Sequence, residues 1–103
     1  MARAKTELFP ERVQEMSLIA RALGHPARLS VVIHLLNNGE TSAMNLVRLL
    51  PLSQPATSRH LAVLKQAGVV RARDQGAQVY YSLQKGTVRA LCQALQRNLA
   101  PKG

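Results

Sequence analysis

Residues 53–68, SQPATSRHLAVLKQAG, and residues 69–83, VVRARDQGAQVYYSL, carry the clearest structural signals in this chain. In the first part, Ser53 can cap the start of a helix, and Pro55 fits the first turn of that helix. Gly68 favours the left-handed turn that commonly ends a helix. The first part therefore predicts a helix with defined ends.

The second part changes from helical to alternating periodicity. In VVRARD, Arg71 and Arg73 share one face, opposite Val70 and Ala72, and QVYYSL alternates in the same way. Gly76 lies between these two segments and can adopt the positive φ of a hairpin tip. This part predicts two short strands joined by a tight turn, which together form a basic wing.

The residues before this stretch predict three further helices. Helical spacing of apolar residues runs from Pro10 to near Gly24, and it starts again at Pro26. The second of these helices closes at NNG, and its predicted apolar face consists of Leu29, Val32, Ile33 and Leu36. Ser42 can cap a short third helix, which Pro51 stops.

Helical spacing returns after Lys85 and Gly86, with an apolar stripe formed by Val88, Leu91, Cys92, Leu95 and Leu99. The predicted order is α-α-α-α-β-β-α, with a turn of about four residues between the third and fourth helices. We therefore predict a mainly α fold with a β-hairpin wing, a winged helix-turn-helix. Residues 1–103 are expected to form one such domain, with helices for dimerisation at both ends.

The charge of the chain is strongly basic and unevenly distributed. There are 14 Lys and Arg residues against 5 Asp and Glu residues. From Thr41 to the end, nine basic residues face a single acid, Asp74. A polyanion is the natural partner for that half, although such charge can also be a solubilising surface.

Composition argues against a membrane or secreted protein. No apolar run approaches the ~20 residues of a spanning helix, Trp is absent, and MARAKTELFPER has no signal-peptide core. Cys92 is the only cysteine, so no intrachain disulfide can form, which agrees with a reducing compartment. We expect a cytoplasmic protein without membrane contact.

The predicted helix over residues 53–67 has the features of a helix that contacts DNA bases. If Leu61 and Leu64 face inward, Thr57 lies on the buried side, and the outward residues are Gln54, Pro55, Ser58, Arg59 and Ala62. Gln can pair with adenine, Arg with guanine, and Ser with either a base or a phosphate. The alternative is a solvated helix face. In the hairpin, contacts to phosphate or to the minor groove are predicted for Arg71, Arg73, Gln75 and Gln78, although exposed hairpin arginines are common.

Three segments carry a resemblance to a known family: ALGHPARLSVV, LSQPATSRHLAVLKQAGVVRARDQG and VYYSL. Together they resemble the ArsR (SmtB) family of winged-helix repressors from about Ala20 to Leu83. The resemblance implies homodimers that bind palindromic operators in double-stranded DNA and leave them when an effector binds. It assigns to the recognition helix Ser53, Gln54, Ser58, Arg59 and His60, and to the wing the hairpin over residues 69–83.

The resemblance also implies pairing of subunits through the first and last helices. The candidate interface residues are Met16, Ile19, Leu23, Leu91, Leu95 and Leu99. Taken without the family, these stripes are explained equally well as core.

The chain departs from the family at its metal sites. Where metal sensors of this kind carry a segment resembling ELCVC, this chain has ETSAM, with Ser42 and Met44 at the thiolate positions. Neither side chain supplies a soft anionic ligand. The last helix, GTVRALCQALQRN, contains no acid and no histidine, and the three histidines do not form a spaced ligand set. We expect no metal site and no cofactor.

Cys92 is a candidate redox sensor, but it lacks a resolving thiol in the same chain. Its place on the apolar stripe favours a buried, inert thiol. An enzyme is not expected, because no nucleophile motif, phosphate loop or carboxylate pair is present. The prediction is a sequence-specific DNA-binding regulator; the alternative is a winged-helix module that holds a protein or a structured RNA.

Overall fold

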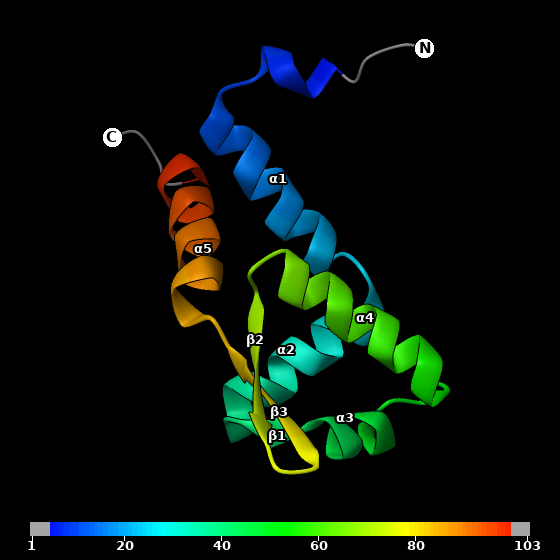
Figure 1. The fold of residues 1–103 in the computed structure, drawn as a ribbon. Coiled ribbons are helices and arrows are strands. Elements are labelled where there is room, and N and C mark those ends of the chain that lie inside the picture. The colour runs from blue at the N-terminus through cyan, green and yellow to red at the C-terminus, as the bar shows by residue number, and fades with distance from the viewer. Residues whose placement is uncertain (1–4, 100–103) are drawn as a thin grey trace.

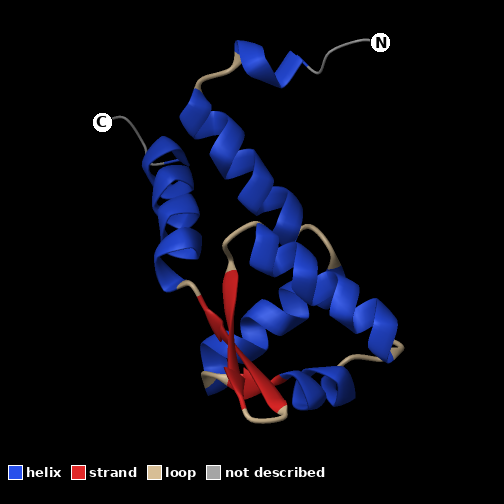
Figure 2. Cartoon of the chain, viewed as in Figure 1, coloured by secondary structure: helices blue, strands red, loops and turns tan. Residues whose placement is uncertain are grey.

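A computed structural model describes residues 5–99, and the order of elements in it confirms the predicted fold (Figures 1 and 2). The helices are η1 (Lys5–Leu8, a 3-10 helix), α1 (Glu11–Leu23), α2 (Pro26–Asn38), α3 (Ala43–Leu49), α4 (Gln54–Gln66) and α5 (Lys85–Leu99). The strands are β1 (Thr41–Ser42), β2 (Val70–Gln75) and β3 (Gln78–Leu83). The short elements η1 and β1 were not predicted, because two to four residues carry no usable periodicity.

The residues that end the helices act as the sequence predicts. The side-chain oxygens of Ser42 and Ser53 accept hydrogen bonds from the backbone N–H groups of Asn45 and Ala56, each at 3.2 Å. These bonds satisfy donors that the first turn of a helix leaves without an intrahelical partner. Gly68 adopts a φ of 76° just after α4, which only glycine accommodates readily. The start and end of α4 are therefore set locally.

The three strands form an antiparallel sheet in the order β1-β3-β2. Strand β2 pairs with β3 from Val70 opposite Leu83 to Gln75 opposite Gln78. Gly76 and Ala77 form the two-residue turn between the strands. Gly76 is its first residue and has a φ of 62°, and such turns favour glycine at this position. The pairing confirms the hairpin and places Arg71 and Arg73 on one face of it.

The core joins α2, α3 and α4 to the hairpin. It includes Val31, Val32, Leu35, Leu46, Leu61, Leu64, Val69 and Val70, all of them at most 3% exposed. The burial of Leu61, Leu64 and Thr57 fixes the rotation of α4 about its axis. The predicted inward face of this helix is thereby confirmed.

The predicted apolar face of α2 is wrong by part of a turn. Leu29, Ile33 and Leu36 are 45%, 49% and 56% exposed, and of the predicted set only Val32 is buried. The buried face of α2 consists of Ala27, Val31, Val32 and Leu35. Helical spacing is the same for both faces, and contact with α4 and β3 selects the one that is buried.

Figure 1 shows α1 and α5 side by side at one end of the molecule, while α3, the start of α4 and the hairpin tip lie at the other. Helix α5 buries Leu91 and Ala94. None of the helices within residues 5–99 combines the length and the apolarity needed to cross a membrane. The arrangement places the outer ends of the two terminal helices away from α3, the start of α4 and the hairpin tip.

Candidate nucleic-acid interface

The outer face of α4 presents polar side chains near its N-terminus. Gln54, Ser58 and Arg59 are exposed, as are Pro55 and Ala62, on the side away from the buried residues of the helix. The cap residue Ser53 is exposed as well. The N-terminal end of a helix carries a partial positive charge and N–H groups that favour phosphate. The outer face of α4 can therefore present side chains suited to base recognition, next to a helix N-terminus that favours phosphate. The contacts of these side chains with DNA remain a prediction.

His60 differs from the other predicted recognition residues. It is half-buried, and the centre of its ring lies 4.3 Å from that of His25, with the two rings tilted by 42°. His25 in turn caps α2, because its Nδ1 accepts a hydrogen bond of 3.1 Å from the backbone N–H of Ala27. The structure thus places His60 where α4 meets the start of α2, and its role in DNA contact stays a prediction.

The surroundings of His60 disfavour its charged form. Burial lowers the pKa of His60 below its usual 6.5, and electrostatic interactions with His25, Arg28 and Arg59 lower this pKa further. The imidazole is therefore neutral at pH 7 and adds no charge to the interface.

The two arginines of the wing have different surroundings. Arg73 is bound to Glu40 by two hydrogen bonds: its Nη2 donates to Oε1 at 2.7 Å, and its Nε donates to Oε2 at 3.1 Å. Its Nη1 also donates to Oε1 of Gln75. The guanidinium carbon lies 5.1 Å from the ring centre of Tyr80, which is its partner across the strands. All four predicted wing residues are exposed, but Arg73 is also bound by Glu40 and Gln75 within the protein. No such contact engages Arg71 or Gln78 among the described side-chain hydrogen bonds.

The ion pair also changes the titration of both partners. The hydrogen bonds from Arg73 are the main reason that the pKa of Glu40 lies below its usual 4.5, and the same bonds raise the pKa of Arg73. Sequence reasoning missed Glu40, because it lies 33 positions before Arg73 in the chain and no local pattern connects them.

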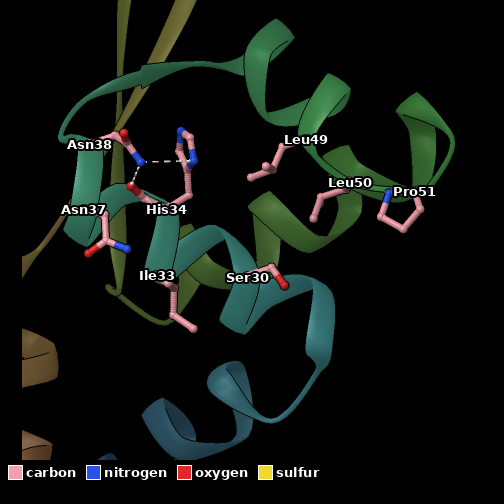
Figure 3. Close-up of a pocket in the computed structure, with 8 residues that line it drawn as sticks. All are labelled: Ser30, Ile33, His34, Asn37, Asn38, Leu49, Leu50 and Pro51. Atoms are coloured by element: carbon pink, nitrogen blue, oxygen red, sulfur yellow. Dashed lines mark hydrogen bonds between the residues drawn. The ribbon is translucent and has the colours of Figure 1, made fainter.

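An open hollow of about 360 Å³ lies between α2 and the turn that joins α3 to α4 (Figure 3). Its lining is half polar and half apolar: Ser30, His34, Asn37, Asn38, Ile33, Leu49, Leu50 and Pro51. The amide nitrogen of Asn38 donates to the backbone oxygen of His34 at 3.0 Å and lies 3.3 Å from His34 Nδ1. No Lys, Arg, Asp or Glu is among the lining residues, so the hollow is not built for a phosphate.

The terminal helices contain the candidate dimer residues. Met16, Ile19 and Leu23 of α1 are half-buried, Leu91 of α5 is buried, and Leu95 is 49% exposed. The side chain of Leu99 lies outside the described part of the chain. These residues are partly covered in one chain, and their role in pairing remains a prediction.

The expectation of a buried Cys92 is wrong, because its side chain is exposed. Helix α5 buries Leu91 and Ala94, so Cys92 lies beside the buried edge of the helix and not within it. Among residues 5–99, no three His, Cys, Asp or Glu side chains gather in a way that could hold a metal ion.

A helix-turn-helix with exposed polar residues on its second helix, flanked by a basic hairpin, defines the class of winged helix-turn-helix proteins. Comparison with known proteins identifies the family within this class. Residues 25–72 match the model of the bacterial regulatory protein, arsR family.

The chain is 35% identical over 85 residues to a biofilm growth-associated repressor of Agrobacterium fabrum, and the aligned region covers 82% of this chain and 72% of the relative. It is also 35% identical over 95 residues to the transcriptional activator HlyU of Vibrio cholerae, covering 85% of this chain and 87% of the relative. The solved structure of HlyU matches with a TM-score of 0.73 at 32% identity, over 88% of this chain and 98% of that one. The chain belongs to the ArsR family, and it is a DNA-binding transcriptional regulator, not an enzyme.

Proposed function

We propose that this regulator is a homodimeric repressor that binds a palindromic operator in double-stranded DNA. The observation that carries the proposal is the outer face of α4, where Gln54, Ser58 and Arg59 are exposed at the start of a helix whose opposite face is locked into the core. Side chains held by a fixed helix can discriminate bases, whereas mobile ones contribute mainly charge.

The dimer pairs α1 and α5 of one subunit with the same helices of its partner. Exposed apolar side chains on these helices support the proposal, among them Val13, Leu18 and Leu95. A twofold dimer then inserts one α4 helix into each of two successive major grooves, with half-sites about 10 bp apart. The wings contact the flanking backbone.

Repression follows from occupying a promoter, which needs the DNA-binding dimer and nothing more. One relative is named a repressor and another an activator, so the direction of regulation is part of the proposal. Release from DNA requires an effector that binds one dimer geometry better than the other. We propose that this effector is not a metal held at the family's usual sites, because Ser42, Met44 and a last helix without acids or histidines occupy those positions. We propose that this regulator works in the cytoplasm and that residues 1–103 form one winged helix-turn-helix domain.

The proposal is tested by fluorescence anisotropy with the promoter duplex upstream of its own gene and a scrambled duplex, across a salt series. We expect a strong preference for the promoter that persists at about 150 mM salt. Arg59→Ala should remove about 1 to 3 kcal/mol of discrimination at one base position of each half-site. Equal binding of both duplexes that disappears as salt is added contradicts base recognition and favours a protein or structured RNA as the partner.

A further inference from the structure

Glu40 lies at the corner between α2 and β1, directly after Gly39, whose φ is 76°. The hydroxyl of Thr41 donates to the backbone oxygen of Gly39 at 3.0 Å, and Thr41 then pairs with Tyr81 of β3. The backbone on both sides of Glu40 is therefore held, and its carboxylate projects from a fixed corner.

The side chains of Arg73 and Glu40 are 49% and 38% exposed, but they make more contacts than a typical surface ion pair. Exposed pairs contribute little when two long side chains must be fixed for a single contact. Here both carboxylate oxygens accept from the guanidinium of Arg73, and that guanidinium also lies over Tyr80. Two parallel hydrogen bonds and a cation–π contact together offset the conformational entropy that is lost when the side chains of Arg73 and Glu40 are fixed. The contact ties β2 to a part of the chain outside the hairpin.

The negative charge of Glu40 is unfavourable for DNA binding if its only effect is electrostatic. A carboxylate beside a wing that approaches DNA repels phosphate and weakens binding. Glu40 and Asp74 are the only acids after Glu15. An acid in this half has a favourable role only if its contact with Arg73 outweighs the repulsion.

We propose that Glu40 is a positioning residue for DNA binding: through Arg73 it holds the β2–β3 hairpin at the angle in which Arg71 and the hairpin tip reach the DNA backbone. This inference rests on the proposed function and deepens it. It divides the two wing arginines, since Arg73 supports the hairpin and Arg71 contacts phosphate.

The experiment compares Glu40→Gln with Asp74→Asn on both the promoter and the scrambled duplex. Each change removes one negative charge from the region of the wing and keeps the side chain's shape, and only Glu40→Gln breaks the ion pair. We expect Glu40→Gln to weaken affinity for either duplex about fivefold, the equivalent of about 1 kcal/mol. Asp74→Asn should leave affinity unchanged or raise it. If Glu40→Gln also raises affinity, Glu40 only repels DNA and the proposal is overturned.

The salt dependence of binding, and the effect of Glu40→Gln in a protein that already carries Arg71→Gln, distinguish two roles of Glu40. In one, Glu40 positions the hairpin; in the other, it only keeps Arg73 from binding a phosphate. Arg71→Gln should reduce the slope of log affinity against log salt by about 0.9, as expected for one lost phosphate contact. Adding Glu40→Gln to Arg71→Gln should cause little further loss, because the contact that Glu40 positions is already absent. A slope that becomes steeper by about 0.9 in Glu40→Gln means that Arg73 has been released to a phosphate, which overturns the proposal.

Arg73→Lys gives a second variant, because lysine keeps the charge but cannot make two parallel hydrogen bonds to a carboxylate. The proposal predicts weaker binding for Arg73→Lys with an unchanged circular dichroism spectrum and faster hydrogen exchange at Gly76 and Ala77. Unchanged affinity contradicts the proposal. If the wild-type protein binds the promoter and the scrambled duplex equally, base recognition is contradicted but the role of Glu40 is not. The comparison of Glu40→Gln with Asp74→Asn can still be made, because it works on either duplex.

Discussion

Thr57 tests whether α4 is rotated as described. Its side chain is 0% exposed, and within the described residues its hydroxyl oxygen has no hydrogen-bond partner. A buried hydroxyl without a partner destabilises a fold by about 1–3 kcal/mol. Thr57→Val replaces this hydroxyl with a methyl group of similar size and keeps the β-branched shape. The free energy of unfolding should therefore rise by about 1–3 kcal/mol, with the melting temperature higher by about 4–8 °C per kcal/mol.

The assay is urea unfolding followed by circular dichroism, combined with anisotropy on the promoter duplex. Thr57→Val should leave DNA affinity unchanged, because the side chain points into the core. Thr57→Ser is the matched control: it keeps the hydroxyl and removes a buried methyl, so it should destabilise by about 1 kcal/mol. Lower stability of Thr57→Val would refute the absence of a partner for the hydroxyl. Loss of DNA affinity in Thr57→Val at unchanged stability would refute the rotation of α4.

Two further predictions concern the dimer and the response to pH. Leu95→Glu should shift the protein from dimer to monomer in sedimentation velocity, because it puts a charge into the proposed interface. The control Gln93→Glu, on another face of α5, should leave the dimer intact. A dimer that persists in Leu95→Glu contradicts pairing through this face. Because the pKa of His60 lies below 6.5 in the folded protein, the unfolded chain binds more protons as pH falls through 6.5. The free energy of unfolding should therefore decrease from about pH 7.5 to about pH 5.5, and His60→Gln should remove part of this decrease; an identical pH profile in His60→Gln contradicts the effect.

Local features of the sequence were sufficient to predict most of the fold. Ser42 and Ser53 begin their helices through hydrogen bonds that span three residues, and Gly76 forms a turn between two directly adjacent strands. The outward residues of α4 follow from helical spacing once Leu61 and Leu64 are taken as buried. These predictions succeed because each depends on contacts within a few positions of the chain.

The order of the elements, the ends of α4, the residues on its outer face and the basic hairpin could all be predicted from the amino-acid sequence. The buried apolar face of α2 could not be predicted in this way, because two faces have the same spacing and packing against the neighbouring elements selects one of them. The contact of His60 with His25 and the ion pair of Glu40 with Arg73 likewise depend on tertiary packing. Each of these pairs joins residues more than thirty positions apart, and no local periodicity encodes such a contact, since it exists only after α2, α4 and the hairpin have packed together.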